Sequence, residues 1–215
     1  MKRYGVTAGV IAGVAALAGA GSLLLGGAQP SDAAANGNAS AFHQAGAASV
    51  QQVAVKSTSV TFVKRYFERK YPHGYLSNAL LPKTWHEVHV AAHQTRFDDT
   101  ANARMIRFNT WWGPETPKSA LSRKLTALKG TRGLHIVGTS TVSMRSTTGQ
   151  GPLTVSTVVY TYKSGSTTRW VATRYVAQKG RKYADAEITV AGKPADSKVL
   201  GLVINNATQS LVITP

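Results

Sequence analysis

Residues 134–190 place the strongest constraint on the fold of this chain. This part of the sequence contains four segments rich in Val, Thr and Tyr, which are residue types enriched in β-strands. Short glycine-containing runs, GQGP, KSGS and KGRK, separate the segments and suit tight turns. Strands joined by such short links pair antiparallel, so the sequence predicts a run of antiparallel hairpins. The predicted strands are Leu134–Met144, Thr154–Tyr162, Thr167–Gln178 and Tyr183–Val190.

Two segments ahead of these strands have the spacing of apolar residues that predicts amphipathic helices. In Thr58–Tyr71, valine and phenylalanine side chains recur at helical spacing, and Pro72 follows directly. Pro82 suits the first turn of a second helix, which we expect to run to about Thr95. Both segments are therefore predicted to be helices that precede most of the sheet.

A third predicted helix has the fullest set of boundary signals. Thr116 can cap its N-terminus, Pro117 suits the first helical position, and Gly130 is placed to end it. Leucines at 121, 125 and 128 form its apolar stripe. This segment is the clearest helix in the sequence.

The remaining apolar segments predict strands. Polar and apolar side chains alternate over Ala103–Trp112, and Val199–Ile204 and Leu211–Ile213 are short apolar pieces that suit an edge pair. Segregated helices and strands of this kind predict an α+β fold. We expect two or three N-terminal helices packed on a curved antiparallel sheet of four to six strands.

Two stretches carry a resemblance to a known superfamily. FVKRYFERKYPHGYL, Phe62–Leu76, is similar to the opening helix of nuclear-transport-factor-two-like (cystatin-like) domains, and TRWVATRYVAQ, Thr168–Gln178, is similar to their late Trp-bearing strand. The resemblance, to secreted domains of this type from Gram-positive bacteria, would cover Val53–Val190. It implies a small cone in which helices cover a bent sheet, with a mouth that serves as an active site or as a binding or dimerisation surface.

The N-terminus has the pattern of an export signal. Lys2 and Arg3 precede an uncharged run from Val6 to Ala28, and small residues follow, so we expect cleavage after Ala35. A run of about 20 apolar residues can also span a bilayer, which leaves an uncleaved anchor as the alternative. Both readings place the domain outside the cell, either secreted or anchored at the cell surface by a single span. We divide the chain into a signal, 1–35, a flexible spacer, 36–52, and one folded domain, 53–215.

Cysteine content and net charge restrict how the exported part can be stabilised and which ligands it attracts. The chain has no cysteine, so its stability must come from a hydrophobic core instead of disulfides. Removal of the signal takes 25 basic and 9 acidic residues to 23 and 8, a net charge of +15. Such a chain attracts polyanions through their phosphates, for example teichoic acids, anionic lipid headgroups or nucleic acid, of which nucleic acid is not favoured.

The third predicted helix offers a local candidate for such contacts. Lys118, Arg123, Lys124 and Lys129 are predicted to lie off its leucine stripe and to form one basic face. The alternative is that this face is simply solvated, as charged helix faces commonly are.

Three histidines raise the question of a metal or ligand site. On the second predicted helix His86, His89 and His93 would share one face, where imidazoles can bind zinc or copper. One ion could take His89 and His93, but the three together span up to about 10 Å along a helix. The zinc-protease motif is absent because position 90 is Val. Structural histidines, with His89 partly buried against the sheet, are the favoured reading, so we predict no metal and no cofactor.

Neighbouring residues complete the candidate ligand site. Trp111 and Trp112 could line a pocket with the three histidines, and an acid–base pair of His86 or His93 with Asp98 is a further hypothesis. The leading hypothesis is a secreted, non-enzymatic, envelope-associated protein that binds an anionic polymer or an envelope partner. The alternatives are a small-ligand or enzymatic domain that uses the histidine face, and a membrane-anchored subunit of an envelope assembly.

Overall fold

The computed structural model describes residues 60–69, 75–110 and 114–213, all of which belong to one compact unit. The predicted signal, the predicted spacer, Trp111 and Trp112 lie outside the described residues.

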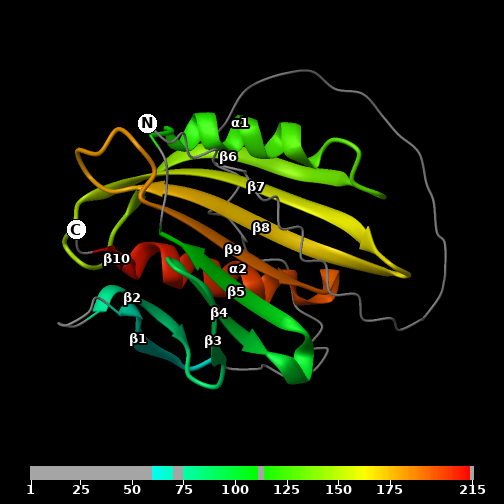
Figure 1. Ribbon diagram of the computed structural model, residues 1–215, viewed down its shortest axis with the longest axis horizontal. Helices are drawn as coiled ribbons and strands as arrows, with labels where there is room; N and C mark the ends of the chain where they lie inside the picture. Colours follow the sequence, from blue (N-terminus) through cyan, green and yellow to red (C-terminus); the bar gives the residue numbers. More distant parts are fainter. Residues whose placement is uncertain (1–59, 70–74, 111–113, 214–215) are drawn as a thin grey trace, which may run out of the picture. The chain divides into compact units, whose positions relative to one another are not determined.

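The described chain is built mainly from β-strands, which form two antiparallel sheets (Figure 1). The larger sheet has seven strands in the order β3-β4-β5-β9-β8-β7-β6, and the smaller has the order β1-β2-β10. The strands are β1 Phe62–Arg69, β2 Tyr75–Pro82, β3 His86–Ala91, β4 Gln94–Asp99, β5 Arg104–Asn109, β6 His135–Arg145, β7 Pro152–Ser164, β8 Thr167–Ala177, β9 Ala186–Gly192 and β10 Val212–Ile213. The helices are α1 Pro117–Leu128 and α2 Ser197–Ser210, with short 3-10 turns at Thr100–Asn102 and Pro194–Asp196.

The two α-helices cover opposite faces of the seven-stranded sheet. Side chains alternate between the faces of a strand, so Val171 and Tyr175 of β8 pack with α1, whereas Ala172 and Val176 pack in the cluster that contains α2. The α2 helix also packs against β2, which places it between the two sheets (Figure 1). Each face of the large sheet therefore has its own apolar cluster.

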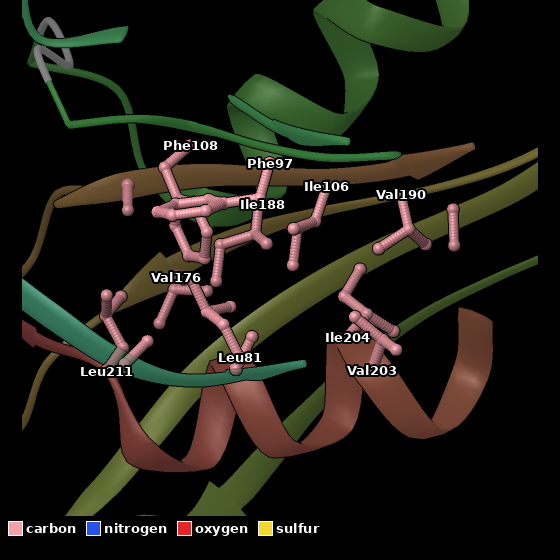
Figure 2. Close-up of a cluster of buried hydrophobic side chains, with 14 of the residues drawn as sticks. Leu81, Phe97, Ile106, Phe108, Val176, Ile188, Val190, Val203, Ile204 and Leu211 are labelled. Carbon is pink, nitrogen blue, oxygen red and sulfur yellow. The ribbon is translucent and has the colours of Figure 1, made fainter. Parts of the chain in front are cut away.

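The larger cluster lies on the α2 face and joins both sheets to the helix (Figure 2). Ile204 of α2 points toward the strands, where Val190 and Ile188 project into the same cluster (Figure 2). Phe67 of β1 is fully buried, and its ring centroid lies 4.5 Å from that of Phe108 on β5. These contacts hold the small sheet against the large one.

The predicted α+β fold with N-terminal helices is wrong. Thr58–Tyr71 was expected to be helical, but Phe62–Arg69 is strand β1. The aromatic and β-branched residues of this segment suit a pleated strand as well as a helix. As a strand it places Phe67 and Arg65 on the same face: Phe67 enters the core, and Arg65 lies over the ring of Phe97 at 5.4 Å.

The predicted second helix, Pro82–Thr95, is also wrong. From His86 onward it belongs to the β3–β4 hairpin, whose register pairs His86 with Asp98 and His89 with Thr95. His93 takes a left-handed backbone, with φ of 60°, at the turn. The turn lacks the glycine that marks most hairpins, so its sequence carried no turn signal.

The later elements divide between confirmed and corrected predictions. Thr116 caps α1 by accepting a hydrogen bond from Ser119 N, as expected, and the five strands predicted between residues 103 and 190 are β5 to β9. Val199–Ile204 was expected to be a strand but lies inside α2. Leu211–Ile213 contributes edge strand β10, which pairs with β2.

Candidate functional site

A strip of polar side chains lies on the α1 face of the seven-stranded sheet. Gln94, Asn109 and Glu187 stand in register across β4, β5 and β9, as do Arg96, Arg107 and Thr189 one row along. We call these six residues the polar strip. Both rows lie beside the part of the sheet that α1 covers, since α1 packs on β7 and β8.

An ion pair lies at the centre of the polar strip. Arg107 Nη2 donates to Glu187 Oε1 at 3.0 Å, and the Glu187 side chain is only 10% exposed. Thr189 Oγ1 donates to the same carboxylate oxygen at 3.2 Å and is 3.0 Å from Thr173 Oγ1. The carboxylate is therefore held from two sides on the sheet surface.

Lys124 brings a third charge to this centre from α1. The helix buries Pro117, Ala120, Leu121 and Leu128, and Lys124 lies on the same side of the helix as these residues. Burial lowers the pKa of its ammonium; the Glu187 carboxylate opposes this shift, and Arg107 and Arg123 add to it. Lys124 therefore belongs to the interface between helix and sheet.

Two buried tyrosines border the same centre. Burial raises the pKa of Tyr160 to about 12, with smaller contributions from Tyr162 and Glu187 in the same direction. Burial also raises the pKa of Tyr175, again with Glu187 acting in the same direction. Both phenols are therefore neutral at physiological pH and act as hydrogen-bonding groups and apolar surface, not as bases.

Buried polar atoms without a hydrogen-bond partner mark one end of the strip. Asn109 Oδ1 and Thr110 Oγ1, at the end of β5, are both buried and unpaired in the described structure. Unsatisfied buried polar atoms are uncommon and costly in folded proteins. Arg96, at the other side of the strip, is 40% exposed and paired with Asp98.

The three histidines do not form the face that the sequence predicted. Because β3 is a strand, His86 and His89 are three residues apart and point to opposite faces of the sheet. His93 lies beyond the strand in the turn, and His86 and His89 are exposed, so the expectation that His89 is partly buried is wrong. His86 stands directly across from Asp98, which is instead engaged by Arg96 at 2.9 Å. No group of three or more His, Cys, Asp or Glu side chains suited to a metal ion occurs among the described residues.

The four basic residues predicted on α1 also separate. Arg123 pairs with Glu115 at 2.9 Å, and Lys124 faces the sheet. Lys118 and Lys129 are exposed at opposite ends of the helix. These positions do not form one continuous basic face, and a role for them in polyanion contact stays a prediction.

A different group of cations gathers where α1 ends. Lys129, Arg132 and Lys163 are all exposed, and Lys163 N donates to Arg132 O at 2.9 Å. The Lys163 side chain lies over Gly133, where an added Cβ would come 2.5 Å from Lys163 Cγ. We call these three residues the α1-end cluster. Lys129 follows the end of α1, Arg132 precedes the start of β6, and Lys163 is near the end of β7.

Ion pairing in the described residues uses arginines only. Six carboxylates are paired, all with arginine side chains and none with a lysine: Asp98, Asp99, Glu115, Asp185, Glu187 and Asp196. The chain contains 9 acidic residues in all, so most of its negative charge is already committed. Its lysines consequently supply most of the uncompensated positive charge.

A shallow cavity of about 500 Å³ lies beside the β8–β9 connection. Arg181, Lys182 and Tyr183 contribute to its wall together with Pro114. Lys182 Nζ lies 5.5 Å from the centroid of the Tyr183 ring, and Arg181 pairs with Asp185 at 3.4 Å. The β8–β9 connection that carries these residues lies at the opposite end of β8 from the β7–β8 turn (Figure 1).

Sequence reasoning missed both the polar strip and the α1-end cluster. Arg107 and Glu187 each interrupt an apolar strand segment, and that interruption was the available signal. Arg132 and Lys163 are far apart in the sequence, and only the pairing of β6 with β7 brings them together. Nothing in their local sequence distinguishes them from other basic residues.

These features define a domain of two antiparallel β-sheets and two α-helices. No protein-family model matches the sequence, and no curated protein sequence is significantly similar to it. The resemblance to cystatin-like domains is therefore unconfirmed.

Comparison with solved structures found 16 similar chains, including the following three. The Ran-binding protein Mog1p of Saccharomyces cerevisiae aligns at a TM-score of 0.47 and 12% identity, over 72% of this chain and 96% of Mog1p. LpqN of Mycobacterium tuberculosis, involved in cell envelope biogenesis, aligns at 0.46 and 14%, over 72% and 92% of the two chains. PA94 of Pseudomonas aeruginosa, a protein of unknown function, aligns at 0.40 and 13%, over 73% and 98%. Likenesses this distant carry no argument about what the chain does.

The structure contains no helix, among residues 60–69, 75–110 and 114–213, that is long and apolar enough to cross a bilayer.

Proposed function

We propose that this chain is an exported, non-enzymatic binding protein whose basic surface contacts an anionic polymer of the cell envelope. Residues 1–35 act as the export signal in this proposal, and the domain works outside the cell. The observation that carries it is the difference between the arginine and lysine side chains of the described residues. Arginines engage the carboxylates, and exposed lysines are left to face solvent.

The α1-end cluster is the proposed principal contact. Its three cations are exposed, adjacent and outside any ion pair among the described residues. A phosphate polymer that crosses them releases counterions, so binding must weaken steeply with salt. Lys118 and the basic wall of the β8–β9 cavity extend the positive surface for a polymer long enough to reach them.

The test is a binding series with the chain that starts at Asn36. Polyphosphate and Gram-positive cell walls, with and without their teichoic acid, serve as probes over a range of salt concentrations. We expect binding to require the phosphate polymer and to fall with salt. The triple variant Lys129→Gln, Arg132→Gln, Lys163→Gln should lower the slope of log affinity against log salt by roughly 2, at about 0.7 per phosphate contact.

A matched control removes the same charge elsewhere. Lys64, Lys83 and Lys198 are also exposed and unpaired in the described structure, and they lie on β1, after β2 and at the start of α2. The triple glutamine variant at these positions should keep most of the affinity. Equal losses in the two triple variants would reject the cluster, and absence of binding at low salt would reject the proposed function.

Localisation is tested separately. In this proposal the mature protein begins at Asn36 and is recovered outside the cell, so N-terminal sequencing of the exported protein reads its first residues. An intact N-terminus in the membrane fraction would replace secretion with the anchored alternative.

A further inference from the structure

The outer edge of β6 is an unpaired strand edge. β6 ends the seven-stranded sheet, and no described strand pairs with its free side. Nine of its eleven residues are exposed. Strands with free N–H and C=O groups are templates for a further strand, and proteins usually protect them with lysine, proline or a bulge.

Protection on β6 is confined to one end. The register shifts between Ile136 and Gly138, which makes the start of the strand irregular. From Gly138 to Arg145 the pairing with β7 is regular, and this stretch contains no lysine, acid or proline. Its single formal charge is Arg145, at the far end.

The opposite edge of the same sheet differs. β3 has only six residues, carries His86, Glu87 and His89, and has a register shift of its own between His89 and Ala91. That edge has the features that discourage strand addition. The comparison singles out β6 as the open edge.

A row of apolar side chains on the large sheet extends to the exposed edge strand β6. On the α2 face, Val142 of β6 lies opposite Val155 of β7, which lies opposite Val176 of β8. Val155 and Val176 are fully buried, whereas Val142 is 46% exposed. The apolar row of the core therefore ends at an exposed valine on the open edge.

The distribution of charge favours a second copy of this chain as the partner of β6. The chain carries a net charge of +16, so most surfaces that two copies could bring together would oppose like charges. Residues 138–144 of β6 carry no charge, and antiparallel pairing would put the two Arg145 side chains at opposite ends. An acidic peptide would find no partner cation along these residues.

We propose that β6 pairs antiparallel with β6 of a second copy of this chain and so joins two seven-stranded sheets across a two-fold axis. Pairing through the regular part of the strand sets Val142 of each copy at the new interface. The inference does not rest on polyanion binding. It also predicts the opposite salt dependence, because salt screens the repulsion between two basic copies and strengthens their association.

The experiment measures the mass of the chain that starts at Asn36 by sedimentation velocity, from low micromolar to about 100 µM and at low and high salt. We expect a monomer–dimer equilibrium that tightens as salt rises. Val142→Lys should weaken dimerisation by at least about tenfold, since it places two lysines at the interface. The matched control is Val90→Lys on β3, because Val90 is 44% exposed and lies near the other edge.

Each outcome decides the proposal. Dimerisation that is lost in Val142→Lys and kept in Val90→Lys supports it. A wild-type chain that is monomeric at high concentration and high salt overturns it, as does a dimer that survives Val142→Lys. Circular dichroism of both variants confirms that each is folded. Polyphosphate binding by the Val142→Lys monomer would show that the two proposals stand or fall separately.

Discussion

Neutralising Glu187 tests whether its carboxylate holds together the charges between α1 and the sheet. In the wild-type chain the carboxylate is nearly buried and accepts hydrogen bonds from Arg107 and Thr189, while Lys124 approaches from the helix. Glu187→Gln keeps the size of the side chain and an acceptor oxygen but removes the charge. The variant therefore leaves two cations facing each other with no anion between them.

The expected loss follows from the geometry. Two unit charges about 4 Å apart interact by about 4 kcal/mol at an effective dielectric constant of ~20. The Arg107 side chain is 36% exposed, so solvent screening reduces this to half or less. We expect the free energy of unfolding to fall by about 2 kcal/mol, which corresponds to a fall in Tm of roughly 4–8 °C for a chain of this length.

The assay is urea unfolding at pH 7 and low salt, with Glu87→Gln as the control. Glu87 lies on exposed β3 and belongs to no ion pair in the described structure, so its replacement should change stability by less than about 0.5 kcal/mol. Lys124→Met removes one of the two orphaned cations and should restore about half of the loss in the Glu187→Gln background. Equal effects of the two glutamine variants, or strict additivity with Lys124→Met, would refute the reasoning.

Three further predictions concern other parts of the fold. The pKa of the Tyr160 phenol is about 12 in the folded chain and about 10 in the unfolded chain, so the unfolded chain loses this proton first as the pH rises. The free energy of unfolding should therefore fall by about 2 kcal/mol between pH 10 and 12. Tyr160→Phe should flatten this part of the pH profile, as measured by urea unfolding. Arg174 donates hydrogen bonds to Ile204 O and to two side chains of α2 but has no acidic partner, and burial lowers its pKa to about 10. Arg174→Lys keeps a buried charge without an acidic partner, so it should lower Tm more than Arg174→Met does. The reverse order of the two Tm values would contradict this account. Gly133→Ala should cost roughly 1 kcal/mol more than Gly165→Ala in the same assay, because both have left-handed backbones but only at Gly133 would the methyl group meet another side chain.

Local signals in the sequence were sufficient for α1 and for the β6–β9 strands. The Thr116 cap, Pro117 and the leucine stripe specify α1 through contacts within a few residues, and the structure shows the same cap. Short glycine-containing turns specified the hairpins in the same way. Wherever turn and cap chemistry is local, the sequence alone located the element.

Tertiary packing decided the elements that the sequence misassigned. Phe62–Arg69 has spacing that suits a helix or a strand, and pairing with β2 together with burial of Phe67 selects the strand. The apolar run within α2 contains β-branched residues that favour a strand, but Leu200, Val203 and Ile204 form one stripe that the sheet buries. Apolar periodicity over a few residues cannot distinguish these outcomes, because the choice depends on a partner surface elsewhere in the chain.

For the candidate sites, too, composition established some properties and the tertiary structure decided the others. Composition alone established a strongly basic chain without cysteine, because charge and residue counts do not depend on the fold. Whether a given cation is free depends on what the fold places beside it: Glu115 neutralises Arg123, α1 turns Lys124 toward the sheet, and the β6–β7 pairing brings Lys163 to Arg132. The histidines separated for the same reason, since a strand sends neighbours three residues apart to opposite faces where a helix would have kept them together.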